Sequence, residues 1–130
     1  MTNTIDDRAI AQARSQLEAI CELVAAYKIV HEKGDDDAAI LQEIYGNPLA
    51  VSVRSDWQTP GSRFELSEYQ LLLCWGGPAV RIIGKLDGGA DPVTARFEYQ
   101  DWFTPWEELR ISTAEREALI DYARFFSFVS

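Results

Sequence analysis

The side chains that could carry out catalysis are few in this sequence. Its single histidine, His31, follows Tyr27 by one turn on the apolar stripe of an expected helix. A histidine in that place is more often a helix-end or interface residue than a general base. No serine or cysteine has a histidine partner suited to nucleophilic catalysis. We therefore predict a protein that is not an enzyme and has no catalytic residues.

The densest run of carboxylates is Asp35-Asp36-Asp37. It lacks the alternating spacing and the closing glutamate of a calcium loop, so capping of a following helix is the better interpretation. The glycine pairs Gly76-Gly77 and Gly88-Gly89 lack the lysine and hydroxyl residue of a phosphate loop, and turns explain both. We therefore predict no metal site and no cofactor.

Aromatic and acidic residues together form the most distinctive pattern, notably in the stretch 101–108 with two tryptophans and three carboxylates. Tryptophan is favoured in interfaces because it combines a large apolar area with a polar N–H. The alternative is that the tryptophans seal the ends of a sheet, and the pattern does not decide between the two. The candidate partner-binding residues are Asp35, Asp36, Asp37, Asp56, Trp57, Asp101, Trp102, Trp106, Glu107 and Glu108, with Arg54, Arg81 and Arg96 as polar companions.

Charge limits the choice of partner. The chain has 21 Asp and Glu against 12 Lys and Arg, a net charge of −9. Such a surface repels phosphate backbones and anionic lipid, so we expect no direct binding to nucleic acid or membrane. A basic protein partner would suit it, although plain solubility is an equally physical reason for the charge. With no apolar run of 18 residues and no signal-peptide pattern, we expect a cytoplasmic protein.

The elements that must position these residues follow from periodicity and suggest one domain over residues 1–130. Helices are expected at 5–33 and 37–45, forming a hairpin. A half-buried strand is expected at 49–54, followed by strands at 70–75, 79–86 and 94–102 in an antiparallel meander. Ser112-Thr-Ala-Glu115 has the capping-box pattern that begins a last helix. The prediction is an α+β fold in which an antiparallel sheet of about four strands has helices packed on one face.

One cross-strand pair is expected on the polar side of this sheet. Arg81 and Glu98 should face each other across neighbouring strands, as an exposed ion pair that contributes only about 0.2–1 kcal/mol.

Four segments also carry a resemblance. Residues 51–57, 72–84, 97–102 with 104–106, and 122–126 resemble small acidic proteins carried by plasmids and phages, and the likeness covers 48–128. It implies an accessory protein of a mobile element and brings no established active site. Small acidic proteins in that setting often act against host defence, for example as inhibitors of CRISPR or restriction complexes.

The leading hypothesis is therefore a non-enzymatic acidic binding protein that docks on a basic, nucleic-acid-binding surface of a CRISPR or restriction nuclease complex. One alternative is a small-molecule or peptide pocket in which Trp75, Arg81, Asp101 and Trp102 converge. Another is a structural homodimer through the long first helix.

Overall fold

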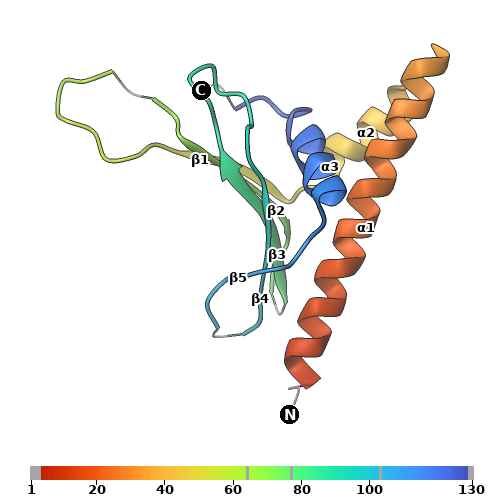
Figure 1. Cartoon of the computed structure of the whole chain (residues 1–130), viewed down its shortest axis with the longest axis horizontal. Helices are drawn as coiled ribbons and strands as arrows, with labels where there is room; N and C mark the ends of the chain where they lie inside the picture. Colours follow the sequence, from red (N-terminus) through yellow and green to blue (C-terminus); the bar gives the residue numbers. More distant parts are fainter. Residues whose placement is uncertain (1–3, 64, 77, 103, 129–130) are drawn as a thin grey trace.

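The computed structural model describes residues 4–63, 65–76, 78–102 and 104–128, with side chains from residue 8 onward. Its elements are α1 (Thr4–Lys33), α2 (Ala38–Gly46), β1 (Ala50–Arg54), β2 (Glu68–Cys74), β3 (Ala79–Lys85), β4 (Arg96–Gln100), β5 (Glu107–Glu108) and α3 (Thr113–Ala123). The strands form one antiparallel sheet in the order β1-β2-β3-β4-β5. Helices α1 and α3 lie on the same side of it (Figure 1). The predicted α+β meander is confirmed, with β5 as a strand that the sequence pattern did not reveal.

Helix α1 forms because its apolar residues recur every three or four positions. Ala13, Leu17, Ile20 and Val24 are all buried on this stripe. The helix ends at Lys33, and Gly34 after it has a φ of +71°, a backbone conformation that glycine adopts without strain. The next N–H, of residue 35, donates to the carbonyl of residue 30 at 3.1 Å, which is the hydrogen bond that closes such an end.

Helix α2 begins after the predicted run of aspartates, and one of them caps it. Asp37 is its N-cap residue but makes no side-chain capping bond. Instead Asp36 Oδ1 accepts a hydrogen bond from the N–H of Ala38 at 3.0 Å. The expected helical hairpin is only approximate, because α2 is short and buries a single residue, Ile44, whereas α1 packs more extensively against α3.

The core lies between the helices and one face of the sheet, which we call the covered face. Tyr69 and Leu71 of β2 and Phe97 of β4 are buried there. The Tyr69 hydroxyl donates to the carbonyl of Thr94 at 2.7 Å. Gly84 passes directly beneath this bond, and an added Cβ would collide with the Thr94 carbonyl oxygen and lie 2.7 Å from the Tyr69 hydroxyl. Glycine is therefore required at this crossing.

Helix α3 and the segment after it close the core. The predicted capping box is confirmed: Ser112 Oγ accepts from the Glu115 N–H at 3.1 Å, and Glu115 Oε1 accepts from the Ser112 N–H at 2.8 Å. Phe128, the last described residue, is 4 % exposed and its ring lies 5.0 Å from that of Tyr69. The apolar end of the chain is thus docked on the sheet as far as it is described.

Strand β1 differs from the prediction in burial. A half-buried strand was expected, but all five of its residues are exposed. Val51 and Val53 pair with Leu71 and Tyr69, so they continue the covered face, yet the main contacts of α1 with the sheet are to β3 and β4. The half-buried pattern fails because helix packing is concentrated on the strands away from this edge.

Both cysteines are free thiols that are partly buried, Cys21 on α1 and Cys74 at the end of β2. Burial is the main cause that raises the pKa of each thiol. No helix in the described part of the chain is both long and apolar enough to cross a membrane.

Candidate partner-binding site

The second face of the sheet, which we call the open face, carries mainly polar side chains. Strand registers place Ser52 opposite Gln70, Arg54 opposite Glu68 and Arg81 opposite Glu98. Because side chains alternate along a strand, these residues all point away from α1 and α3. We define the open-face network as Arg54, Glu68, Gln70, Arg81, Arg96, Glu98 and Glu108.

Arg81 is the centre of this network. Its Nε and Nη2 donate to Glu98 Oε1 at 2.8 and 2.6 Å, and its Nη1 donates to Gln70 Oε1 at 2.7 Å. The guanidinium also lies over the ring of Trp106, 4.1 Å from its centroid, at cation–π distance. The predicted pairing with Glu98 is confirmed. The expected exposure is wrong, because the side chains of Arg81 and Glu98 are only 18 % and 12 % exposed.

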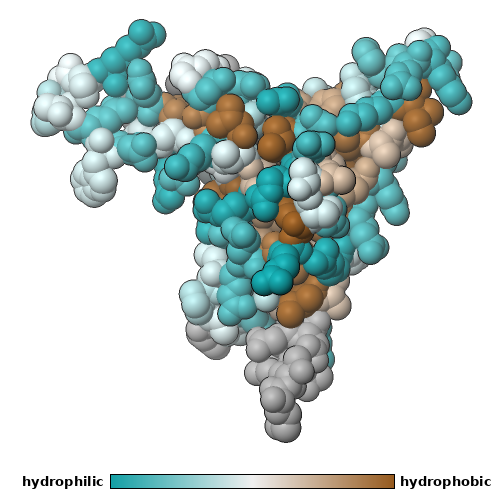
Figure 2. All heavy atoms as spheres, viewed as in Figure 1, coloured by the Kyte–Doolittle hydropathy of each residue, from teal (hydrophilic) through white to brown (hydrophobic). Residues whose placement is uncertain are grey.

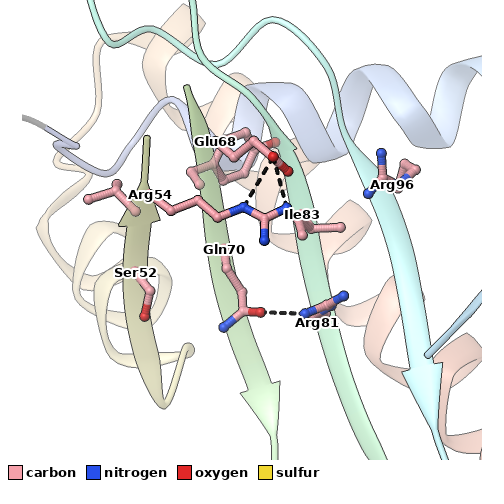
Figure 3. Close-up of a pocket in the computed structure, with 9 residues that line it drawn as sticks. Ser52, Arg54, Glu68, Gln70, Arg81, Ile83 and Arg96 are labelled. Atoms are coloured by element: carbon pink, nitrogen blue, oxygen red, sulfur yellow. Dashed lines mark hydrogen bonds and ion pairs between the residues drawn. The ribbon is translucent and has the colours of Figure 1, made fainter. Parts of the chain in front are cut away.

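A cavity of about 230 Å³ opens on the part of this face formed by β1, β2, β3 and the start of β4. Figure 3 shows Arg54 reaching across β2 to Glu68 and Arg81 directed at Gln70, with the helices behind the sheet. The Arg54 Nε and Nη2 donate to Glu68 Oε1 at 3.1 and 2.8 Å. Arg96 also lines the cavity, and its Nε lies 3.4 Å from Glu98 Oε2.

Arginine side chains provide most of the hydrogen-bond donors in this cavity. Its three guanidinium groups are held in place by carboxylates, and their remaining N–H groups can donate to a carbonyl or carboxylate of a bound molecule. The described residues, which omit 64, 77 and 103 and the chain ends, contain no group of three or more His, Cys, Asp or Glu that could hold a metal ion.

Beside the cavity, the connection between β1 and β2 projects from the body as an arm, described at residues 55–63 and 65–67 (Figure 1). Trp57 on this arm is fully exposed, at 103 %. A hollow of about 600 Å³ lies at the base of the arm. Both Arg54 and Glu68 line this hollow as well as the sheet cavity, so the two form one continuous surface. We call this surface, from Trp57 to Arg96, the arm site.

Among its described residues, which leave out position 64, the outer part of the arm offers little apolar area apart from Trp57. Figure 2 shows it covered mainly by hydrophilic and near-neutral residues. Asp56, Arg63 and Glu65 are all exposed there. The arm turns at Gly61, with φ of +85°, where the N–H of Ser62 donates to the carbonyl of Thr59 at 3.0 Å.

Two of the remaining tryptophans, Trp75 and Trp102, lie at the opposite end of the sheet. Trp75 follows β2 and Trp102 follows β4, and both strands end beside the start of β3. Their side chains are 70 % and 63 % exposed, whereas Trp106 is half-buried against Arg81. The structure therefore separates the predicted aromatic set into Trp57 on the arm, Trp75 and Trp102 at the opposite end of the sheet, and Trp106 against Arg81 of the open-face network.

The predicted acidic residues are also dispersed. Asp35 and Asp36 are exposed and Asp37 is half-buried between α1 and α2. Glu107 and Glu108 are exposed on β5: Glu107 Oε2 accepts from the Tyr99 hydroxyl at 3.0 Å, and Glu108 Oε1 lies 3.7 Å from Arg96 Nε.

Asp101 occupies a turn inside the protein. It is only 8 % exposed, and its Oδ1 accepts from the N–H of Trp102 at 2.8 Å. Thr104 Oγ1 bonds both the N–H and the carbonyl of Asp101, at 3.1 and 3.0 Å. Among the described residues its Oδ2 is buried without a hydrogen-bond partner. Asp101 thus shapes the corner after β4 and presents almost no surface.

The cavity that Arg81 lines is not the predicted pocket, in which Trp75, Arg81, Asp101 and Trp102 were expected to converge. Its other described lining residues come from β1, β2, β3 and β4 and include none of those three. Sequence reasoning singled out Arg54, Arg81 and Arg96 but missed Glu68 and Gln70. The signal was present in the two-residue alternation of β2, in which Glu68 and Gln70 bracket the buried Tyr69.

Comparison with protein-family models, curated proteins and solved structures gives no match for this chain.

Proposed function

We propose that this chain is a non-enzymatic binding protein that holds a basic protein partner at the arm site. The observation that carries the proposal is the full exposure of Trp57 on a projecting arm. A tryptophan side chain left in water forgoes several kcal/mol of burial free energy, and buried aromatic anchors dominate binding energies in interfaces. Trp57 is therefore the expected anchor.

Polar groups around the anchor support a protein partner. Asp56 lies beside Trp57, and the arm also carries Glu65. With the net charge of −9, these carboxylates would attract a positively charged partner and accelerate its association. Once docked, the partner would meet the guanidinium donors of Arg54, Arg81 and Arg96, which favour its carbonyl and carboxylate oxygens.

The resemblance of residues 48–128 to accessory proteins of plasmids and phages directs the choice of partner. The basic, nucleic-acid-binding surfaces of CRISPR and restriction nuclease complexes are the first to be tested. Occupation of such a groove by an acidic protein would inhibit the nuclease by competition with its nucleic acid.

The test measures the affinity of the purified chain for purified nuclease complexes at low and high salt. Trp57→Ala should weaken binding by about tenfold or more, and high salt should slow association. Val93→Ala is the matched control, because Val93 is an apolar side chain that is also exposed, at 45 %, but lies outside the arm site. Binding that is indifferent to Trp57→Ala would contradict the proposal, and binding that is indifferent to salt would remove its electrostatic part.

A further inference from the structure

Strand β1 leaves one edge of the sheet open. It is the first strand of the sheet and pairs with β2 alone among the described strands. An edge strand presents backbone donors and acceptors that can pair with another strand, and many proteins block this with lysine, proline or a bulge. The five residues Ala50–Arg54 contain no proline or lysine, and their one charge, Arg54, is at the end. This edge is therefore competent for pairing.

An apolar stripe runs along the same edge. Leu49, Val51 and Val53 are 65 %, 45 % and 38 % exposed, and Tyr45 at the end of α2 is 54 % exposed. The two valines continue the covered face beyond the helices. Pairing of β1 with another strand would therefore bury apolar side chains as well as satisfy backbone groups.

Two copies of β1 have sequences that allow them to pair with each other in an antiparallel arrangement. When two copies pair around a two-fold axis at Ser52, Val51 of one copy faces Val53 of the other and Ala50 faces Arg54. No like charges are opposed, and an aliphatic pair forms on the apolar side. All five residues of β1 find partners in this register, and such an isologous contact closes on itself as a dimer.

We propose that two copies of this chain associate through β1 to form a continuous ten-stranded antiparallel sheet. Ser52 and Arg54 line the sheet cavity of each copy. The two open-face cavities would adjoin across the two-fold axis, and the two arms would extend from opposite ends of the β1 pair. The inference stands independently of the nature of the partner that binds Trp57.

Light scattering and sedimentation over a range of concentrations test this dimer. The expected mass at high concentration is twice 14.7 kDa, about 29 kDa. Val51→Glu alone and Val53→Lys alone should each weaken association by about tenfold or more, because each places an unpaired charge against a valine. An equimolar mixture should restore it, since the new carboxylate at position 51 then faces the new ammonium at position 53.

Two controls make the result specific. Val93→Glu adds the same charge at a valine of equal exposure, 45 %, away from β1, and should leave the dimer intact. Ile29→Glu, at a side chain that is 54 % exposed on α1, should also leave it intact. Circular dichroism confirms that each variant is folded. A wild-type chain that stays monomeric, a dimer broken by Ile29→Glu but not by Val51→Glu, or a mixture that stays monomeric would overturn the proposal.

Discussion

The covered and open faces of the sheet use alternate residues of the same strands for two different kinds of chemistry. On β2, Tyr69 and Leu71 are buried in the core, whereas the alternating Glu68 and Gln70 line a cavity on the open face. The first set is held by exclusion of water and the second by charge-assisted hydrogen bonds. Stability should therefore depend mainly on the covered face, whereas recognition is the role that we propose for the open face.

The largest effect is expected from Phe97→Ala on the covered face. The Phe97 side chain is fully buried in the core, and its removal leaves a cavity that should cost about 3–5 kcal/mol of unfolding free energy. Chemical denaturation measures this loss. A cost below about 1 kcal/mol would show that the covered face does not carry the stability of the fold.

The next largest effect is expected from alkaline pH, which should lower the free energy of unfolding through two buried tyrosines. Burial raises the pKa of Tyr122 to about 12, partly offset by the hydrogen bond from Asn47, and burial raises the pKa of Tyr69 as well. The unfolded chain releases these protons near pH 10, before the folded chain does, so stability should fall as pH rises from 10 towards 12. Each tyrosine contributes a slope of at most about 1.4 kcal/mol per pH unit.

Urea unfolding at a series of pH values above 9 measures this slope. Tyr122→Phe should reduce it, since phenylalanine has no proton to release. An unchanged slope in this variant would exclude Tyr122 as its source.

The substitution Glu98→Ala tests whether the open face also stabilises the fold. The largely buried Arg81 would lose the acceptor of two hydrogen bonds and keep only Gln70 and Trp106. We expect a loss of about 1–3 kcal/mol in unfolding free energy. Glu117→Ala, at an exposed glutamate of α3, is the control and should change stability by less than about 0.5 kcal/mol. Equal effects of the two substitutions would make the Arg81–Glu98 pair an ordinary surface contact.

The smallest effect on stability is expected from Arg54→Ala. The Arg54 side chain is 67 % exposed, so its ion pair with Glu68 should contribute less than about 1 kcal/mol. Because Arg54 lines both the sheet cavity and the hollow under the arm, partner affinity should fall more than stability does. Parallel binding and unfolding measurements give the two quantities, and a loss in stability larger than the loss in affinity would contradict a recognition role.

Much of the fold follows from local patterns. The stripe on α1, the alternation on β4 and the capping box at Ser112 each specify an element from neighbours in the sequence. The exposure of β1 does not follow from its local pattern. Its alternation of residue types predicts a half-buried strand, and only the extent of the helices decides whether a sheet edge is covered. Two-residue β5 gives no periodic signal at all.

The candidate site was predictable in its residue types but not in its grouping. Arg54, Arg81 and Arg96 come from three strands, and only the register brings them to one cavity. Asp101 and Trp102 are adjacent in sequence, yet the turn buries the first and exposes the second. Exposure of individual side chains depends on tertiary packing, which one sequence does not reveal.

The partial burial of both cysteines has a practical consequence for chemical labelling. A thiol reacts as its thiolate, and the raised pKa values of Cys21 and Cys74 keep the thiolate fraction of each small at neutral pH. A cysteine introduced at the exposed position 58, by Gln58→Cys, should therefore react with maleimide well before either native thiol. The protein can therefore be labelled with a fluorophore on its arm without replacement of its two native cysteines.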